Sequence, residues 1–242
     1  MPHRRDFLKI ASAAALTSTV MGRVHGDAPP AMGAVVTSGV HDGGLKIAVG
    51  PDTLLAKAIT PHILRLDLLA GGKSDPHTPV LDPQAKFSAD PSAKLDPAGS
   101  PISLRTGEFE LRIRRNPCRL TILDKSGKIL LDQHAGQSLH VNPQNQAQSG
   151  FAFGHDKNAD FYGIHTSACW SKTHQPVLKN GTGVANDTYK IDACIEGGGG
   201  APFTWTTAGF GILVDSDGGA GYGASGEQLD FHKAGAGGCL RG

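Results

Sequence analysis

A group of five potential metal ligands lies between residues 155 and 174. It consists of three histidines and two aspartates: His155, Asp156, Asp160, His165 and His174. Transition metals need such side chains at defined spacings on rigid elements. Because the spacings here are irregular and the segment is loop-like, we expect surface or packing histidines, with no metal and no other cofactor.

Four aromatic residues could stack against the apolar face of a pyranose ring. They are Trp170, Phe203, Trp205 and Tyr222. Phe203 and Trp205 alternate with threonines and therefore share one face of a strand. Such a face belongs more often to a core than to a surface. We expect a core position for both residues, with a sugar-stacking platform as the alternative.

The N-terminus has the features of an export signal. Arg4 and Arg5 stand directly before Asp-Phe-Leu-Lys, and a short apolar run follows. A basic start with a run of this length, too short to span a bilayer, is typical of a signal peptide, and paired arginines indicate the twin-arginine route. We predict a signal over residues 1–30, cleaved within residues 22–31, and a periplasmic or secreted protein.

The chain has four cysteines, Cys118, Cys169, Cys194 and Cys239, with neither a CxxC pair nor a zinc spacing. In an exported protein a Cys169–Cys194 disulfide is possible. Free thiols stay equally open, because twin-arginine cargo folds in a reducing cytoplasm.

The composition favours β structure and excludes strongly charged partners. The formal charge of +1 over 242 residues gives no field that attracts nucleic acid or an anionic membrane. The 33 glycines and 15 prolines favour turn-rich strands over helices. Beyond the signal, no apolar run is long enough to cross a membrane.

Alternating patterns predict several antiparallel strands. In "GEFELRIRR", Phe109, Leu111 and Ile113 share one face, and charged residues occupy the other. "CRLTIL" and "ILL" continue a meander through turns at 115–117 and 124–128. "GLKIAV", "PHILRLDLL" and the hairpin "APFTWTTAGFGILVDSDGG" add further strands, whereas residues 70–100, with five prolines, and residues 133–150 read as loops. The class is all-β, a sandwich of two packed sheets.

Four of these stretches, in order, resemble glycoside hydrolase family 31, the α-glucosidase and α-xylosidase family. "HILRLDL", the meander from Thr106 to Gln133, "FYGIH" (161–165) and the hairpin 201–219 are similar to its N-terminal β-sandwich; "FYGIH" resembles a turn there. The resemblance implies a galactose-mutarotase-like supersandwich over residues 31–230, followed by an irregular tail, 231–242. It also places the hairpin near the seam with the family's catalytic barrel.

The resemblance implies a binding role without catalysis. In the family, a loop at 180–189 offers an acidic residue to sugar hydroxyls; Asp187 is the matching position, beside Asn186, with Trp205 as a further substrate-binding residue. An Asx turn is the alternative for this loop. The family's two catalytic carboxylates lie in a barrel of about 250 residues that this chain does not reach. We expect no catalytic residue, and an α-glucoside or α-xyloside and a barrel in cis as partners.

Two other functions use the same fold. The chain could be a stand-alone carbohydrate-binding module, or a mutarotase-like epimerase with a positioned histidine and glutamate as acid and base. After residue 110 the only glutamates are Glu196 and Glu227, and Glu196 adjoins four glycines. We therefore rank the epimerase below the glycosidase domain.

Overall fold

A computed structural model describes the chain as a set of antiparallel strands. The described residues are 32–73, 82, 86–134, 139–140, 150–156, 158–165, 178–179, 189–190, 200–213, 219–225, 228–234 and 239–241. Within them the chain forms three sheets and one 3₁₀ turn, Ala70–Gly72. The all-β prediction is confirmed, and no helix among these residues is long and apolar enough to cross a membrane.

The first sheet has five strands in the order β1-β2-β3-β4-β19. Its strands are β1 (Val35–His41), β2 (Gly44–Val49), β3 (Asp52–Thr60), β4 (Ile63–Leu69) and β19 (Cys239–Arg241). The turn between β1 and β2 is Asp42-Gly43, with φ values of +47° and +71°. Two left-handed residues are what a two-residue hairpin of the primed type requires, and Asp-Gly supplies them at low cost.

The second sheet is long, in the order β14-β17-β18-β11-β9-β8-β7-β6-β5, with β10 paired to β11. One half holds β5 (Lys94–Asp96), β6 (Ile102–Arg105), β7 (Phe109–Arg115), β8 (Cys118–Asp124) and β9 (Ile129–Asp132). The other half holds β10 (Leu139–His140), β11 (Gly150–Gly154), β14 (Tyr189–Lys190), β17 (Gly219–Ser225) and β18 (Gln228–Ala234).

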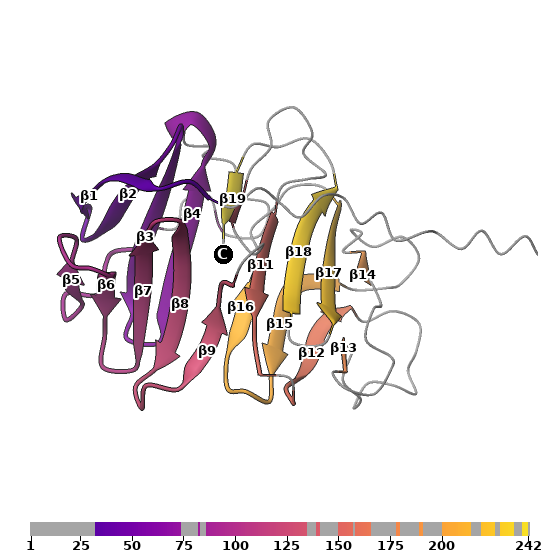
Figure 1. Cartoon of the computed structure of the whole chain (residues 1–242). Coiled ribbons are helices and arrows are strands. Elements are labelled where there is room, and N and C mark those ends of the chain that lie inside the picture. The colour runs from indigo at the N-terminus through magenta and orange to yellow at the C-terminus, as the bar shows by residue number, and fades with distance from the viewer. Residues whose placement is uncertain are drawn as a thin grey trace, which may run out of the picture.

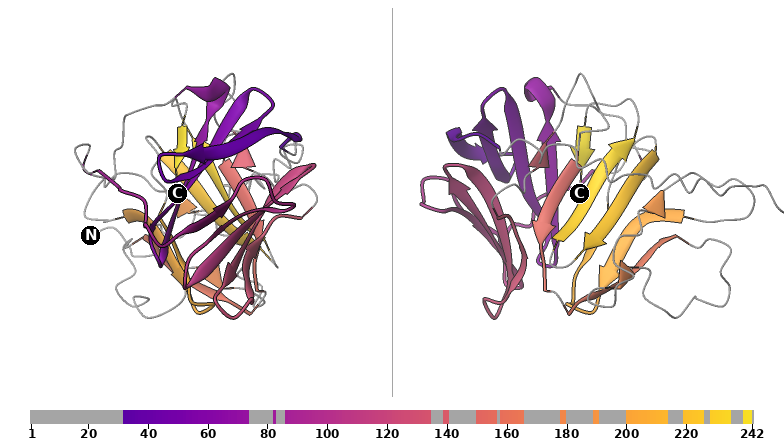
Figure 2. Two further views of the ribbon diagram at one scale, coloured as in Figure 1. Left: turned by 90° about the vertical axis from the view of Figure 1, so that its left-hand side faces the viewer. Right: turned by 45° about the vertical axis from the view of Figure 1, so that its right-hand side comes forward.

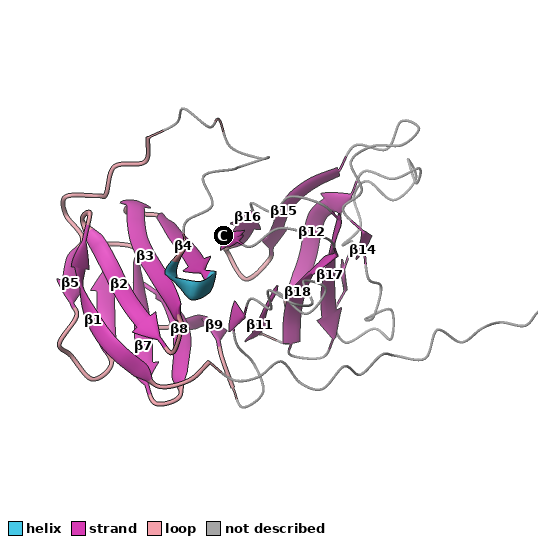
Figure 3. Ribbon diagram, turned by 90° about the horizontal axis from the view of Figure 1, so that it is seen from above, coloured by secondary structure: helices cyan, strands magenta, loops and turns pink. Residues whose placement is uncertain are grey.

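The third sheet has four strands in the order β13-β12-β15-β16. They are β12 (Asp160–His165), β13 (Leu178–Lys179), β15 (Gly200–Thr206) and β16 (Gly211–Leu213). Figure 1 and the view from above in Figure 3 show this sheet behind the β11-β18-β17 half of the long sheet, while β2–β4 lie behind β7 and β8. The two short sheets thus cover one face of the long one, which is the predicted supersandwich (Figure 2).

The core lies between the first sheet and the meander half of the long sheet. Alternate residues of each strand turn inward, as the sequence patterns predict. The largest fully buried side chains are Leu45, Ile47, Leu54, Leu68, Ile102, Leu104, Leu111 and Ile113. Leu64 and Leu66 pack against this cluster, while Ile63 on the opposite face is 53% exposed. Burial of one face of each sheet provides the main favourable free energy of the fold.

A narrow junction joins the two halves of the long sheet. Among the described residues, β9 and β11 pair only at Asp132 and Gly154. Gln133, 3% exposed, strengthens the junction: its Oε1 accepts from the Leu120 N–H at 3.0 Å and its Nε2 donates to the Ala152 carbonyl at 3.3 Å. One buried amide therefore connects β8 to β11 across the end of β9.

Two sequence predictions about irregular segments are wrong in part. Residues 231–234 belong to β18, and residues 239–241 form β19 on the edge of the first sheet, with Leu240 opposite Leu68. β5 lies inside the predicted loop 70–100 and extends the long sheet beside β6. β5 and β19 are short and carry little alternation; β5 is held by pairing with β6, and β19 by pairing with the distant strand β4.

Candidate functional site

The β15–β16 hairpin is the candidate site that the sequence singled out. Phe203 lies opposite Leu213 and Trp205 opposite Gly211 in its register. A four-residue connection closes it. There the Thr206 N–H donates to the Phe210 carbonyl at 2.9 Å, and Gly209 adopts φ +89°, a left-handed conformation that favours glycine. The predicted pair of tightly joined strands is confirmed.

The two faces of this hairpin differ in burial. Phe210 and Ile212 pack against the core cluster, and Thr206 is 5% exposed. On the other face, Phe203 is 41% exposed and Trp205 is 48% exposed. The prediction that Phe203 and Trp205 belong to the core is therefore wrong. Alternation correctly indicated that they share a face, but the face that carries Thr206, Phe210 and Ile212 lies against the core instead.

We call the side chains of Phe203, Trp205 and Leu213 the hairpin face. Leu213 is 36% exposed, so all three remain in contact with solvent. The side chain of Leu213 stands beside that of Phe203, because directly opposed residues of an antiparallel pair share a face. Gly211, opposite Trp205, carries no side chain. The result is a partly exposed apolar surface in which β16 places no side chain opposite the indole ring.

The motif "FYGIH" forms a strand next to this hairpin. It lies in β12, where Tyr162 pairs with Trp205 and Gly163 with Thr204. The interpretation of this motif as a turn is thus wrong, because its residues pair with β15 along most of their length. Two of the four motifs that carry the family resemblance meet in one sheet.

Several predicted site residues lie outside the described residues. They are Arg4, Arg5, Trp170, His174, Asn186, Asp187, Glu196 and Glu227, together with Cys169 and Cys194. Tyr222 is described, but it lies on β17 in the long sheet, in register with Tyr189 and Phe231. The structure does not place Tyr222 in the same sheet as Trp205.

The proposed histidine cluster shows local roles where it is described. His155 Nδ1 lies 2.8 Å from the Asp156 carbonyl, and Asp156 Oδ1 accepts from the Asn158 N–H at 2.9 Å. The latter is an Asx turn. Within the described ranges no three potential metal ligands converge. Asp160 and His165 lie at opposite ends of β12.

The described carboxylates with shifted pKa values are held as anions. The Arg112 guanidinium, then Arg105, lowers the pKa of Glu110, and Lys125 lowers that of Glu108. Hydrogen bonds from Ser126 and from the backbone lower the pKa of Asp124, and Lys57 lowers that of Asp42. A general acid needs a pKa raised towards neutrality. These four groups are therefore suited to ion pairing and not to proton donation.

A groove on the outer face of the first sheet brings together charged residues that sequence reasoning missed. It has a volume of about 260 Å³ and is lined by Lys57, Arg65, Asp67 and Phe87, among others. Arg65 donates to both oxygens of Asp67 at 3.0–3.2 Å and lies 5.3 Å from the centre of the Phe87 ring. Lys57 pairs with Asp42. The alternating charges along β4 were visible in the sequence. The sequence did not show which strands these charges would face.

Comparison with known proteins agrees with the predicted resemblance. No protein-family model matches the chain. It is 28% identical over 222 residues to a 1,6-alpha-glucosyltransferase of Sporosarcina globispora. The matched region covers 86% of this chain and 16% of that protein. The chain thus spans about a sixth of the length of this curated relative.

Solved structures show the same fold. A GH31 dextranase of Flavobacterium johnsoniae, solved with isomaltotriose, superposes with a TM-score of 0.66 at 15% identity, covering 87% of this chain and 26% of that one. A GH31 α-xylosidase from a soil metagenome, solved with xylose, gives 0.57 at 16% identity, covering 81% and 32%. The resemblance to glycoside hydrolase family 31 is confirmed at the level of fold: the chain is a β-sandwich similar to one part of these enzymes.

Proposed function

We propose that this chain is the non-catalytic β-sandwich domain of an exported α-glycosidase of family 31. In that role it forms one wall of a sugar site whose catalytic carboxylates belong to a barrel. The fold similarity supports the family, and the small share of each relative that the chain spans supports a partial enzyme. The observation that carries the proposal is the hairpin face, an apolar aromatic surface on the strands that hold two of the family motifs.

The hairpin face supports contact with a second domain. Phe203 and Trp205 are only about half covered, although they belong to the residue types that bury most surface in interfaces. The opposite side of the hairpin is already packed on the core, so its position is fixed by the sandwich. A barrel that covers this face would gain apolar contact without reordering the strands.

Activity measurements test the proposal directly. The chain purified alone should hydrolyse neither aryl α-glucosides nor aryl α-xylosides, because the family's carboxylate pair lies in the barrel. In a version extended by a matching barrel, Asp187→Ala should lower kcat/KM by about tenfold, roughly 1.4 kcal/mol. Turnover by the lone chain that disappears on mutating one acidic residue would contradict the proposal.

A stand-alone carbohydrate-binding module is the second candidate, and the exposure of Trp205 favours it. A half-exposed indole beside Gly211 offers a flat surface on which a pyranose ring can stack. Titration calorimetry of the lone chain separates the two candidates. The glycosidase-domain proposal predicts millimolar or weaker binding of α-glucosides, whereas micromolar binding abolished by Trp205→Ala, but not by Val40→Ala on exposed β1, supports the module.

Export by the twin-arginine route is part of the proposal. Its basis is the Arg4-Arg5 pair and the apolar run that follows. The double substitution Arg4→Lys with Arg5→Lys should retain the precursor in the cytoplasm, as cell fractionation would detect. Unchanged delivery to the periplasm would exclude this route.

A further inference from the structure

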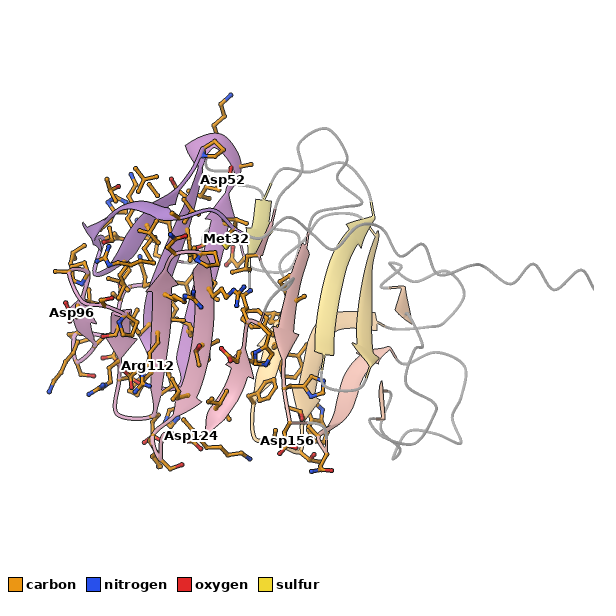
Figure 4. The ribbon with its side chains drawn as sticks, in the orientation of Figure 1. Met32, Asp52, Asp96, Arg112, Asp124 and Asp156 are labelled. Carbon is orange, nitrogen blue, oxygen red and sulfur yellow. The ribbon has the colours of Figure 1, made fainter. Side chains whose placement is uncertain are left out.

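The outer face of the meander carries an unbalanced group of arginines. Arg112 and Arg114 project from β7, and Arg119 from β8, on the side of the long sheet opposite the buried leucines. Figure 4 labels Arg112 on this sheet. Arg105 on β6 belongs to the same face. The carboxylates on the same face are Glu110, Asp132 and, opposite Ser103, Asp96 of β5, so the four arginines outnumber them.

Existing contacts use only part of this donor capacity. Glu110 accepts from Arg105 at 2.8 Å and from Arg112 at 2.9 Å. Arg114 donates from Nε to the Asn116 carbonyl at 3.0 Å. No other described group accepts a hydrogen bond from Arg114, so its two terminal nitrogens are available for a ligand.

Arg119 gives a second, independent observation. Its Nε is buried, and among the described residues it has no hydrogen-bond partner. Arg119 also lies directly opposite Arg114 in the β7–β8 register. Two guanidinium groups at opposed positions repel each other, and a buried donor without an acceptor adds a further cost. The repulsion between the two arginines falls if an anion binds beside Arg114.

A cavity lies beside Arg114, and Arg119 is not among the residues that line it. Its volume is about 360 Å³, and it is lined by Ser100, Pro101, Arg112, Arg114, Arg115 and Thr121. Arg115 donates to the carbonyls of Gly99 and Pro97 at 3.0 and 2.8 Å and so holds the Ser100 side of the cavity against the end of β7. The Thr121 hydroxyl donates to Asp132 at 2.6 Å, which leaves the arginines as the principal free donors.

We propose that this cavity binds a phosphate-type tetrahedral oxyanion, either free or as the phosphate group of a sugar phosphate. Planar guanidinium groups bind such oxyanions through pairs of parallel hydrogen bonds. Arg112 and Arg114, at alternate positions of β7, line the cavity together with Arg115 and Ser100. That arrangement suits a tetrahedral group of charge near −2 better than a flat carboxylate. The proposal is independent of the glycosidase assignment.

Calorimetry of the whole chain with inorganic phosphate, at constant ionic strength in chloride, is the test. Binding at one site is expected, with acetate at least tenfold weaker. Arg114→Gln should weaken phosphate binding at least tenfold. Arg114→Lys keeps the charge but not the planar pair of N–H donors, and it should weaken binding less. Lys46→Gln, which removes an exposed charge from the outer face of the first sheet, is the matched control and should change binding less than twofold.

The source of the anion follows from a second titration. Glucose 6-phosphate binding tenfold tighter than phosphate would support a sugar phosphate, and equal affinities would support free phosphate. The proposal is overturned if phosphate binds no tighter than acetate, or if Lys46→Gln weakens it as much as Arg114→Gln. Since Arg114 is exposed, its variants should fold, and a thermal melt of each checks this.

Discussion

Gln133 and Leu120 form a closed pair of hydrogen bonds in the interior of the sandwich. The Gln133 side-chain oxygen accepts from the Leu120 N–H at 3.0 Å, and the Gln133 N–H donates to the Leu120 carbonyl, also at 3.0 Å. The glutamine thereby continues the β8 ladder after β9 ends at Asp132. A side chain replaces the backbone partner that Leu120 would otherwise lack.

Gln133→Leu should therefore destabilise the protein by about 2–4 kcal/mol. It leaves the Leu120 N–H and the Ala152 carbonyl buried without partners, and each unsatisfied group costs about 1–3 kcal/mol. Urea denaturation followed by tryptophan fluorescence measures the loss. Lys94→Leu, at an exposed position of β5, is the control and should change the free energy of unfolding by less than about 0.5 kcal/mol. Equal losses for the two variants would show that Gln133 has no special structural role.

Acid should weaken the ion pairs on the outer face of the meander. Arg112 and Arg105 lower the pKa of Glu110 below its usual value of 4.5. Because the folded-state pKa is lower than the unfolded one, the stability that Glu110 contributes is present above pH 4.5 and is lost as pH falls through the folded-state pKa.

Glu110→Gln should accordingly lower the unfolding free energy by about 0.5–1 kcal/mol at neutral pH and flatten its dependence on pH below about 4.5. Thermal melts across this range, in low and high salt, provide the measurement. Glu108→Gln is the control with a smaller expected effect, because among the described residues its carboxylate forms an ion pair with the exposed Lys125 alone. A pH profile identical to that of the parent chain would contradict the assigned ion pairing.

Cys118 should be unreactive in the folded protein. Its side chain is 1% exposed, and burial raises the pKa of the thiol to about 12. Since the thiolate is the nucleophile, alkylation by iodoacetamide at mildly basic pH should be about a thousandfold slower than for an exposed thiol. Peptide mass spectrometry before and after unfolding in urea measures this rate. Rapid labelling of Cys118 in the native chain would place it outside the core.

Period-two alternation predicted the sandwich because it depends only on local order along the chain. In β7 and β8 the inward residues, Leu111 and Leu120, are fully buried, as the patterns require. The short strand β19 could not be predicted in this way, since three residues show little pattern and their partner, β4, lies far away in sequence. Pairing over such distances is decided by the whole fold.

Alternation also cannot decide which of two apolar faces is buried. In the hairpin, both faces carry apolar residues, with Phe203 and Leu213 on one and Phe210 and Ile212 on the other. The core covers the second face, where Thr206 is also buried. The arginines of the meander are a second case that alternation could not decide. The sequence shows the charges on β7, but only the β7–β8 register shows that Arg114 lies directly opposite Arg119.

Substitutions at two adjacent positions of β16 should separate the two faces of the hairpin. Leu213 is 36% exposed, and Leu213→Thr should change the unfolding free energy by less than about 1 kcal/mol. Ile212 packs against the core, and Ile212→Thr should cost about 1–3 kcal/mol, because it removes buried apolar contact and introduces a hydroxyl. Both variants place threonine in the same strand, so the introduced side chain is matched. Leu213→Thr should also reduce self-association of the lone chain in sedimentation measurements, since an uncovered apolar face promotes it. If Leu213→Thr proved the more destabilising of the two, the hairpin face would be part of the core, and its proposed role as a contact surface would fail.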